Sequence, residues 1–344
     1  MKIRMTAKPI KIAIALLAAT AATAAAQDGT SAYNFLNITS SSRIYGLGGV
    51  NITTVEEELS TTDQNPALLG PEMTNQVQVD YMRYLGDSNF AGARYTHSAG
   101  ERGAWAVGVR FFGYGSMKET DAEGNILGTF SPKDLNFNAS FSYDITDRLR
   151  GGVTLKVLNS SYEQYSAFAL ATDLGLNYYD PDHDVSLSVV GANLGGQLKK
   201  FNDRTHSLPI DLRLGITKGF TGIPLRVSIT AWNLTKWHLP FYETGDGTSS
   251  EEFKVKDSFT SNLFRHLVFG LDFTPSERFY IALGYNYKTR TDMSTYSRSF
   301  LSGFSLGAGL NLDRFSLGLA FAQPHSGATT LMVNLNLNLQ DILN

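Results

Sequence analysis

The C-terminal residues 331–339 alternate strictly between two kinds of side chain. Every odd position is apolar, and three of the positions between them are asparagine: Leu331, Val333, Leu335, Leu337 and Leu339 against Asn334, Asn336 and Asn338. Successive side chains of a β-strand point to opposite faces, so this segment predicts a strand with one apolar and one polar face. The pattern recurs in about fourteen segments. Together they predict an all-β, antiparallel transmembrane barrel, with lipid outside and a polar lumen inside.

The alternating segments and their connections predict the size and orientation of this barrel. The fourteen segments span residues 76–84, 89–98, 103–112, 135–143, 149–158, 168–179, 185–194, 210–218, 225–234, 266–273, 279–287, 301–312, 314–322 and 331–339. The even-numbered connections are short, whereas most odd-numbered ones are long. Bacterial outer-membrane barrels have short periplasmic turns and longer outer loops. The alternative is an exported soluble propeller or sandwich, which also has many alternating strands.

Residues 1–26 predict a secretory signal peptide. Four basic residues precede an uncharged apolar run over 12–26 that ends in three alanines. This order of charge, apolar run and small residues is typical of export signals. Cleavage would remove four of the 29 basic residues and none of the 32 acidic ones, so the net charge would fall from −3 to −7. An acidic chain argues against nucleic acid as a partner.

Residues 27–74 do not alternate, and they are rich in Ser, Thr, Asn and Gly. Gly48 and Gly49 allow tight backbone, and Asn65-Pro66 predicts a turn. So many residues with turn chemistry predict a plug folded into the lumen, ahead of a barrel over 75–344. A disordered periplasmic tail is the alternative.

Seven charged residues occupy positions predicted to face the lumen: Arg110, Lys156, Asp173, Asp211, Arg213, Arg226 and Asp272. One interpretation makes them ion-paired groups that hold the plug. The other makes them a path for a substrate or an ion. Because the remaining inward positions are mostly Gly, Ala, Ser and Asn, we favour the first interpretation.

Four short elements of the predicted plug resemble the N-terminus of the PorQ family of the type IX secretion system. They are residues 29–37 (Gly-Thr-Ser-Ala-Tyr-Asn-Phe-Leu-Asn), Ser40-Ser41-Ser42-Arg43, Leu47-Gly48-Gly49-Val50-Asn51 and residues 63–69 (Asp-Gln-Asn-Pro-Ala-Leu-Leu). The Leu-Gly-Gly and Asn-Pro-Ala elements also resemble, more loosely, PorV and the FadL-type fatty-acid channels, which are fourteen-stranded barrels with an N-terminal hatch.

The resemblance to PorQ implies a non-catalytic outer-membrane protein of the surface attachment complex. Its implied partners at the cell surface are PorZ, PorU and PorV, beside outer-membrane lipid and lipopolysaccharide. The looser resemblance implies instead a transporter of hydrophobic small molecules. Such a transporter would have a kinked strand, for which Gly151-Gly152 and Val189-Val190 are the candidates.

The predicted loop 235–265 contains five aromatic residues: Phe241, Tyr242, Phe253, Phe259 and Phe264. Exposed aromatic side chains suit the anchors of a protein interface, so this loop is the candidate docking surface. The alternative is a loop that packs on itself.

The sequence predicts no catalytic, cofactor-binding or metal-binding site. The six histidines show no metal-ligand spacing on one element. Residues 303–307, Gly-Phe-Ser-Leu-Gly, match an esterase motif that requires a strand-turn-helix elbow. Here the motif lies inside a predicted strand with Ser305 facing inward, which favours ordinary packing in the lumen. An outer-membrane esterase is the remaining alternative.

Overall fold

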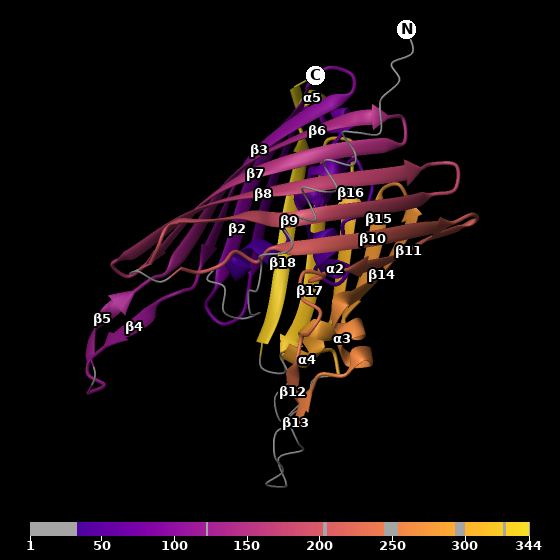
Figure 1. Ribbon diagram of the computed structural model, residues 1–344. Helices are drawn as coiled ribbons and strands as arrows, with labels where there is room; N and C mark the ends of the chain where they lie inside the picture. Colours follow the sequence, from indigo (N-terminus) through magenta and orange to yellow (C-terminus); the bar gives the residue numbers. More distant parts are fainter. Residues whose placement is uncertain are drawn as a thin grey trace, which may run out of the picture.

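The computed structural model describes residues 33–121, 123–201, 205–243, 254–292, 300–325 and 328–343. Fourteen strands form one closed barrel (Figure 1). They are β1 (Gln76–Arg83), β2 (Asn89–Ser98), β3 (Gly103–Gly113), β6 (Lys133–Thr146), β7 (Leu149–Tyr162), β8 (Tyr165–Asp180), β9 (Val185–Lys199), β10 (Asp211–Phe220), β11 (Ile223–Ala231), β14 (Leu267–Ser276), β15 (Phe279–Asn286), β16 (Phe304–Asn311), β17 (Phe315–His325) and β18 (Ala328–Asn338). The predicted fold class is therefore confirmed.

Every barrel strand pairs antiparallel with the barrel strands before and after it, and β1 pairs with β18 to close the wall. The register at the closure sets Val79 opposite Leu335. Closure leaves the barrel sheet without an edge strand, and edge strands are the usual route to edge-to-edge aggregation. We call the end of the barrel with the short connections the turn end, and the opposite end the loop end.

Side chains alternate across the wall as the sequence predicts. In β3, Ala106 and Arg110 are buried, whereas Trp105, Val107 and Phe111 are exposed on the outside. The outward positions of the other strands carry Leu, Ile, Val, Phe and Tyr in the same way. The barrel thus presents an apolar belt outward and polar or small side chains inward, the arrangement of a barrel set in lipid.

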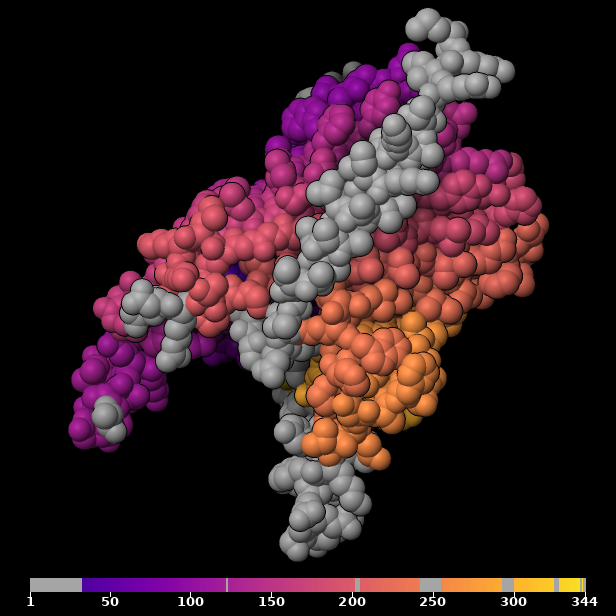
Figure 2. Space-filling model, viewed as in Figure 1, coloured from indigo at the N-terminus to yellow at the C-terminus, as the bar shows by residue number. Residues whose placement is uncertain are grey.

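The loop end differs from the prediction, because several strands run beyond the predicted limits. Strands β6 to β9 are 14 to 16 residues long. The predicted loop between β3 and β6 contains a hairpin of β4 (Met117–Thr120) and β5 (Ile126–Phe130). This hairpin stands away from the barrel as an arm (Figure 2). Its strands are too short to give a clear alternating pattern, which explains why the sequence reading missed them.

The predicted loop 235–265 also contains regular structure. A small sheet pairs β12 (Phe241–Glu243) with β13 (Lys254–Lys256), and the helix α3 (Phe259–His266) follows. A second short helix, α4 (Tyr287–Asp292), follows β15, and α5 (Leu339–Leu343) follows β18. No helix in the described part of the chain is long and apolar enough to cross a membrane.

Of the two candidate kinks, Val189-Val190 lies near an irregularity in strand pairing and Gly151-Gly152 does not. On β8 the pairing with β9 shifts between Thr172 and Leu174, where Leu174 faces Gly191 and Thr172 faces Leu194. The extra residue of β9 therefore falls just after Val189-Val190, with Asn193 at a φ of 57°. The pairing of Gly151-Gly152 is regular on both sides.

The described N-terminal residues pack inside the lumen, as the plug hypothesis predicts. Residues 33–74 form a compact chain of one short α-helix and four 3-10 turns: η1 (Asn34–Asn37), α2 (Ser42–Gly46), η2 (Leu59–Asp63), η3 (Pro66–Leu68) and η4 (Pro71–Met73). The segment starts in the loop-end half, where Gln197 of β9 donates to Tyr33, and it enters β1 at the turn end. The predicted signal peptide lies outside the described residues.

Candidate functional site

Arg43, on α2, is the central contact between plug and wall. Its side chain lies 2.7 Å from Asp272 of β14 and 2.9 Å from Glu56 of the plug. Its guanidinium also lies over the ring of Tyr280, 4.4 Å from the centroid. Burial disfavours the charge, but the two carboxylates outweigh that effect and raise the pKa of Arg43. The arginine therefore stays charged, and it joins two carboxylates from different parts of the fold.

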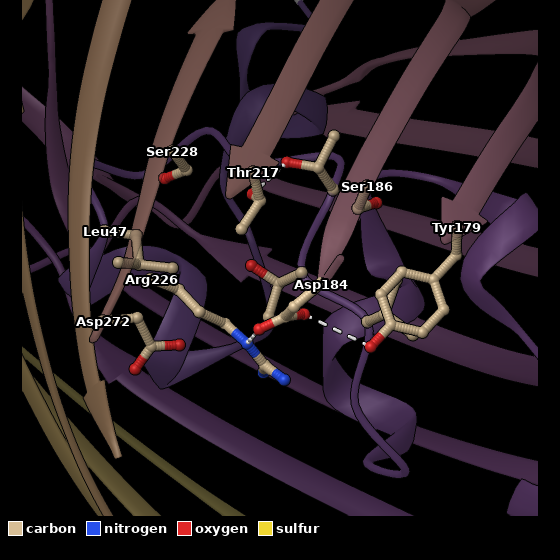
Figure 3. A pocket seen from close by; sticks show the side chains of 11 residues that line it. Leu47, Tyr179, Asp184, Ser186, Thr217, Arg226, Ser228 and Asp272 are labelled. Carbon is tan, nitrogen blue, oxygen red and sulfur yellow. Dashed lines mark hydrogen bonds and ion pairs between the residues drawn. The ribbon is translucent and has the colours of Figure 1, made fainter. Parts of the chain in front are cut away.

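Arg226 of β11 extends this network toward the turn end. It lies 2.6 Å from Glu56 and 2.9 Å from Asp184, which also accepts a hydrogen bond from Tyr179 (Figure 3). A cavity of about 10 Å³ lies between these groups and Asp272. That volume has room for about one water molecule. The network is thus nearly close-packed.

Two further ion pairs tie the plug to the opposite wall. Arg110 of β3 pairs with Asp63, and Arg150 of β7 lies 2.9 Å from Glu72. The Arg110 pair is almost fully buried, whereas the Arg150 pair is partly exposed at the turn end. Plug and wall are therefore joined by charge on two sides of the lumen.

The remaining predicted charges pair along the wall itself. Lys156 lies 2.6 Å from Asp173, and Arg213 lies 2.7 Å from Asp211. Arg213 also donates to the side chain of Asn37 in the plug, at 3.1 Å. Of the seven predicted lumen charges, Arg110, Arg226 and Asp272 thus form ion pairs with the plug, and the other four pair with one another.

Several residues that hold the plug were missed by the sequence reading. Arg94 of β2 donates to Thr62 at 2.9 Å, and Asn334 of β18 donates to Glu58 at 3.0 Å. Arg94 also occupies an inward position of its strand, so the alternation that identified Arg110 could have found it. The carboxylates of the plug carry no such signal, because the plug is not periodic.

The Leu-Gly-Gly element of the plug packs directly on the wall. Gly48 and Gly49 have φ angles of +101° and +83°, in the region that favours glycine. The backbone of Gly48 lies against Gly284 of β15, where a Cβ would stand 2.0 Å from the Gly48 nitrogen. Glycine is therefore needed on both sides of this contact.

The Asn65-Pro66 element packs in the same way on the other side of the lumen. The Asn65 side chain accepts from the backbone of Ala67 at 2.9 Å and donates to the carbonyl of Ile52 at 2.8 Å. A Cβ on Gly152 would lie 2.4 Å from the carbonyl carbon of Pro66. Gly152 therefore makes room for the plug, and the Gly151-Gly152 pair does not bend its strand.

The loop-end half of the lumen contains an apolar cluster, which we call the apolar chamber. It joins Tyr33, Phe35 and Leu36 of the plug to wall and loop residues. The wall and loop members are Met82, Phe90, Phe112, Leu158, Ala169, Ala171, Leu208, Ala320 and Met332. The ring of Phe35 stacks on that of Phe112 at 6.4 Å. The first described residues of the chain thus fill an apolar space inside a largely polar lumen.

Aromatic rings continue from the apolar chamber toward the loop end. Phe112 contacts Tyr114 at 4.7 Å, Tyr114 contacts Tyr162 at 5.6 Å, and Tyr162 contacts Phe201 at 5.1 Å. Burial and the nearby carboxylate of Asp134 raise the pKa of Tyr114, so its hydroxyl stays protonated. This line of rings connects the chamber to the outer rim.

The predicted docking aromatics do not form one surface. Phe241 is buried, and the guanidinium of Arg265 lies 4.9 Å from its ring centroid. Phe259 and Phe264, on α3, are exposed. Phe253 and the side chain of Tyr242 lie outside the described residues. Part of this loop therefore packs on itself, which was the alternative.

Ser305 lies on a regular strand, β16, instead of an elbow. Its hydroxyl accepts from the backbone of Gly48 at 3.0 Å and donates to the carbonyl of Gly46 at 2.9 Å. The serine is thus occupied by plug backbone, as ordinary packing predicts. Across the residues that the structure describes, no three His, Cys, Asp or Glu side chains gather to hold a metal ion.

Below the plug, the turn end is hollowed by a space of about 1380 Å³, lined by polar and apolar residues. Side chains of both charge signs border it, among them Glu72, Asp147, Arg150 and Arg278. The lumen is thus open at the turn end, whereas its loop-end half contains the filled apolar chamber.

Several solved structures are similar to this fold. The toluene transporter TbuX of Ralstonia pickettii is similar with a TM-score of 0.53 and 13% identity, over 88% of this chain and 98% of that one. The toluene transporter TodX of Pseudomonas putida gives a TM-score of 0.50 and 12% identity, over 87% and 96%. A FadL homologue of Pseudomonas aeruginosa gives 0.50 and 11%, over 87% and 98%. At these identities the likeness concerns the fold.

No family model and no curated protein matches the chain. The class that fold and lumen define is a closed, fourteen-stranded antiparallel barrel with its N-terminal segment packed inside as a plug.

Proposed function

We propose that this protein is an outer-membrane barrel that takes up hydrophobic small molecules through its loop end. The apolar chamber is the observation that carries the proposal, because a barrel for ions or sugars has no need of an apolar space in its lumen. The fold supports it, since it is shared with two proteins described as toluene transporters.

The plug divides into two parts by the way it is held. The part from residue 39 onward is fixed by the ion pairs of Arg43, Arg110, Arg150 and Arg226. Residues 33–38 are held mainly by apolar contacts in the chamber. Apolar contacts do not depend on direction, so a hydrophobic solute can replace them at little cost. Residues 33–38 are thus the part of the plug that a solute displaces.

The wall beside the chamber offers a route toward the membrane. Beyond Ala192, β9 has no paired partner on β10, and the segment before β10 runs along this edge instead. Leu208 and Ile210 of that segment pack in or against the apolar cluster. Movement of this segment would open the chamber sideways without breaking a strand pair.

Replacing Phe35 by alanine is expected to strengthen the binding of a hydrophobic probe. The ring is 3% exposed, and losing a buried phenylalanine costs ~3–5 kcal/mol. The loss destabilises the solute-free state, in which Phe35 occupies the chamber, and not the state in which a solute has displaced it. Affinity for a fluorescent fatty acid should therefore rise about tenfold for every ~1.4 kcal/mol by which the solute-free state is destabilised. Tyr81→Ala, on the outside of β1, should leave affinity unchanged. No binding to either the parent or Phe35→Ala would refute the transport proposal.

A docking role in a type IX secretion system is the second candidate. It rests on the PorQ-like order of elements in the plug and on the β4–β5 arm, which offers exposed backbone to a partner. This role predicts that a tagged copy, purified from outer membranes in mild detergent, retains PorU, PorV and PorZ, together with lipopolysaccharide. Removing residues 117–130 should release any partner that binds the arm. A barrel recovered without partners would contradict this role.

A further inference from the structure

The helix α3 buries three polar side chains and exposes both of its phenylalanines, with Thr260 exposed between them. Asn262 and His266 are each 1% exposed and Arg265 is 3% exposed, whereas Phe259 is 67% and Phe264 44% exposed. A surface helix of a soluble domain has the opposite arrangement, with its apolar stripe toward the core. Such reversed polarity suits a helix whose outer face meets hydrocarbon.

Hydrogen bonds on the buried face fix this orientation. Asn262 accepts from the backbone of Leu239 at 2.9 Å, and Arg265 lies 2.5 Å from Asp292 of α4. The two ring nitrogens of His266 lie 2.8 and 3.1 Å from backbone carbonyl oxygens of the preceding loop. Turning the helix over would break these bonds and leave the polar groups buried without partners, so the two phenylalanines remain outside.

The exposed face of α3 is continuous with the apolar belt of the barrel. The helix runs directly into β14, whose outward side chains include Leu271 and Phe273. It lies at the edge of the barrel beside α4 (Figure 1). Trp237 packs on Phe259 at 5.3 Å, and Phe264 lies 6.2 Å from Tyr287, which follows β15. Aromatic rings thus gather where this side of the belt ends, as they do at membrane interfaces.

The length of β14 leaves a gap that α3 can fill. The outward apolar positions run only from Leu267 to Phe273. At ~3.4 Å per residue and a tilt of ~40°, that stretch covers about 16 Å of height. The apolar band of such barrels is ~25 Å tall. The belt above β14 therefore lacks a height that one or two turns of an apolar helix would supply.

We propose that the Phe259–Phe264 face of α3 is embedded among the acyl chains of the outer leaflet and completes the belt above β14. The occupant of this face is lipid, not a protein partner, because the face continues the lipid-facing wall. The inference assumes the membrane location proposed above, but it does not depend on the passage of solutes.

Quenching by lipid tests the proposal directly. Since the chain contains no cysteine, one introduced cysteine takes a fluorophore at a single position. Phe259→Cys and Phe264→Cys would be compared in phosphatidylcholine vesicles with and without doxyl-labelled acyl chains. Leu283→Cys, in the belt of β15, is the lipid reference, and Ile126→Cys, on the β4–β5 arm, is the water reference. A heat-dependent shift on electrophoresis verifies that each variant is folded.

We expect labels at 259 and 264 to lose fluorescence to the doxyl lipid to a similar extent as the label at 283, and to resist aqueous iodide. Labels that behave like the one at 126 would show that this face lies in water. That result would overturn the proposal and leave the face available to a protein partner. Absence of quenching at 283 as well would overturn the membrane location together with it.

Discussion

Replacing Arg43 by methionine is expected to loosen the plug by about 3–5 kcal/mol, because it leaves Asp272 as a buried carboxylate without its cation. Asp272 is 5% exposed, and Arg43 is the cation that contacts it at 2.7 Å. A cysteine in place of Leu69, which is 0% exposed in the plug, reports the loosening as faster thiol labelling. The rate should rise on the order of a hundredfold or more, at about tenfold per ~1.4 kcal/mol.

A matched control uses an arginine whose ion pairs are exposed. Arg148 lies 3.0 Å from Asp180 and has a side chain 43% exposed, so Arg148→Met should change the labelling rate by little, within ~1 kcal/mol. Adding Asp272→Leu to Arg43→Met removes the orphaned charge and should restore much of the protection. Equal effects of the Arg43 and Arg148 changes would show that the buried network does not hold the plug.

Replacing Gly284 by valine is expected to force the plug off the wall and open the lumen to ions. The new Cβ would stand 2.0 Å from the nitrogen of Gly48 and 2.2 Å from the carbonyl carbon of Leu47. Both are backbone atoms and cannot rotate away, so the cost exceeds the ~1–3 kcal/mol of ordinary overpacking. Planar-bilayer recordings should show conductance well above that of the parent protein.

The control for this change is another strand glycine with free space around it. A Cβ on Gly196 of β9 would meet nothing within 4 Å, so Gly196→Val should keep the conductance of the parent. A folded Gly284→Val barrel that conducts no more than the parent would show that the plug can shift without opening the lumen.

The wall of the barrel was largely readable from the sequence because it is periodic. In β18 and β3, every second side chain faces lipid. Once Leu335 or Trp105 is assigned to the outside, the direction of every other side chain in its strand follows. The same parity placed Arg110, Arg226 and Asp272 in the lumen before any contact was known. It failed for β4 and β5, where four- and five-residue strands in water have no lipid face to impose a pattern.

The partners of the lumen charges were not readable, because they are distant in sequence. Arg43 and Asp272 are 229 positions apart, and the residues around each of them do not indicate that the two pair. The aromatic residues of the 235–265 region show the same limit. Phe241 is buried whereas Phe259 and Phe264 are exposed, although the sequence pattern does not distinguish the three.

The sequence by itself determined the class of architecture: fourteen antiparallel strands, the face each side chain takes, and a non-periodic segment ahead of them. These features follow from local rules of alternation and turn chemistry, which act over a few residues. The tertiary structure alone decided how the plug is seated, which carboxylate meets which arginine, and that the plug's first residues fill an apolar chamber. Those outcomes depend on burial and charge pairing between remote segments, and closure of the barrel is what brings the segments together.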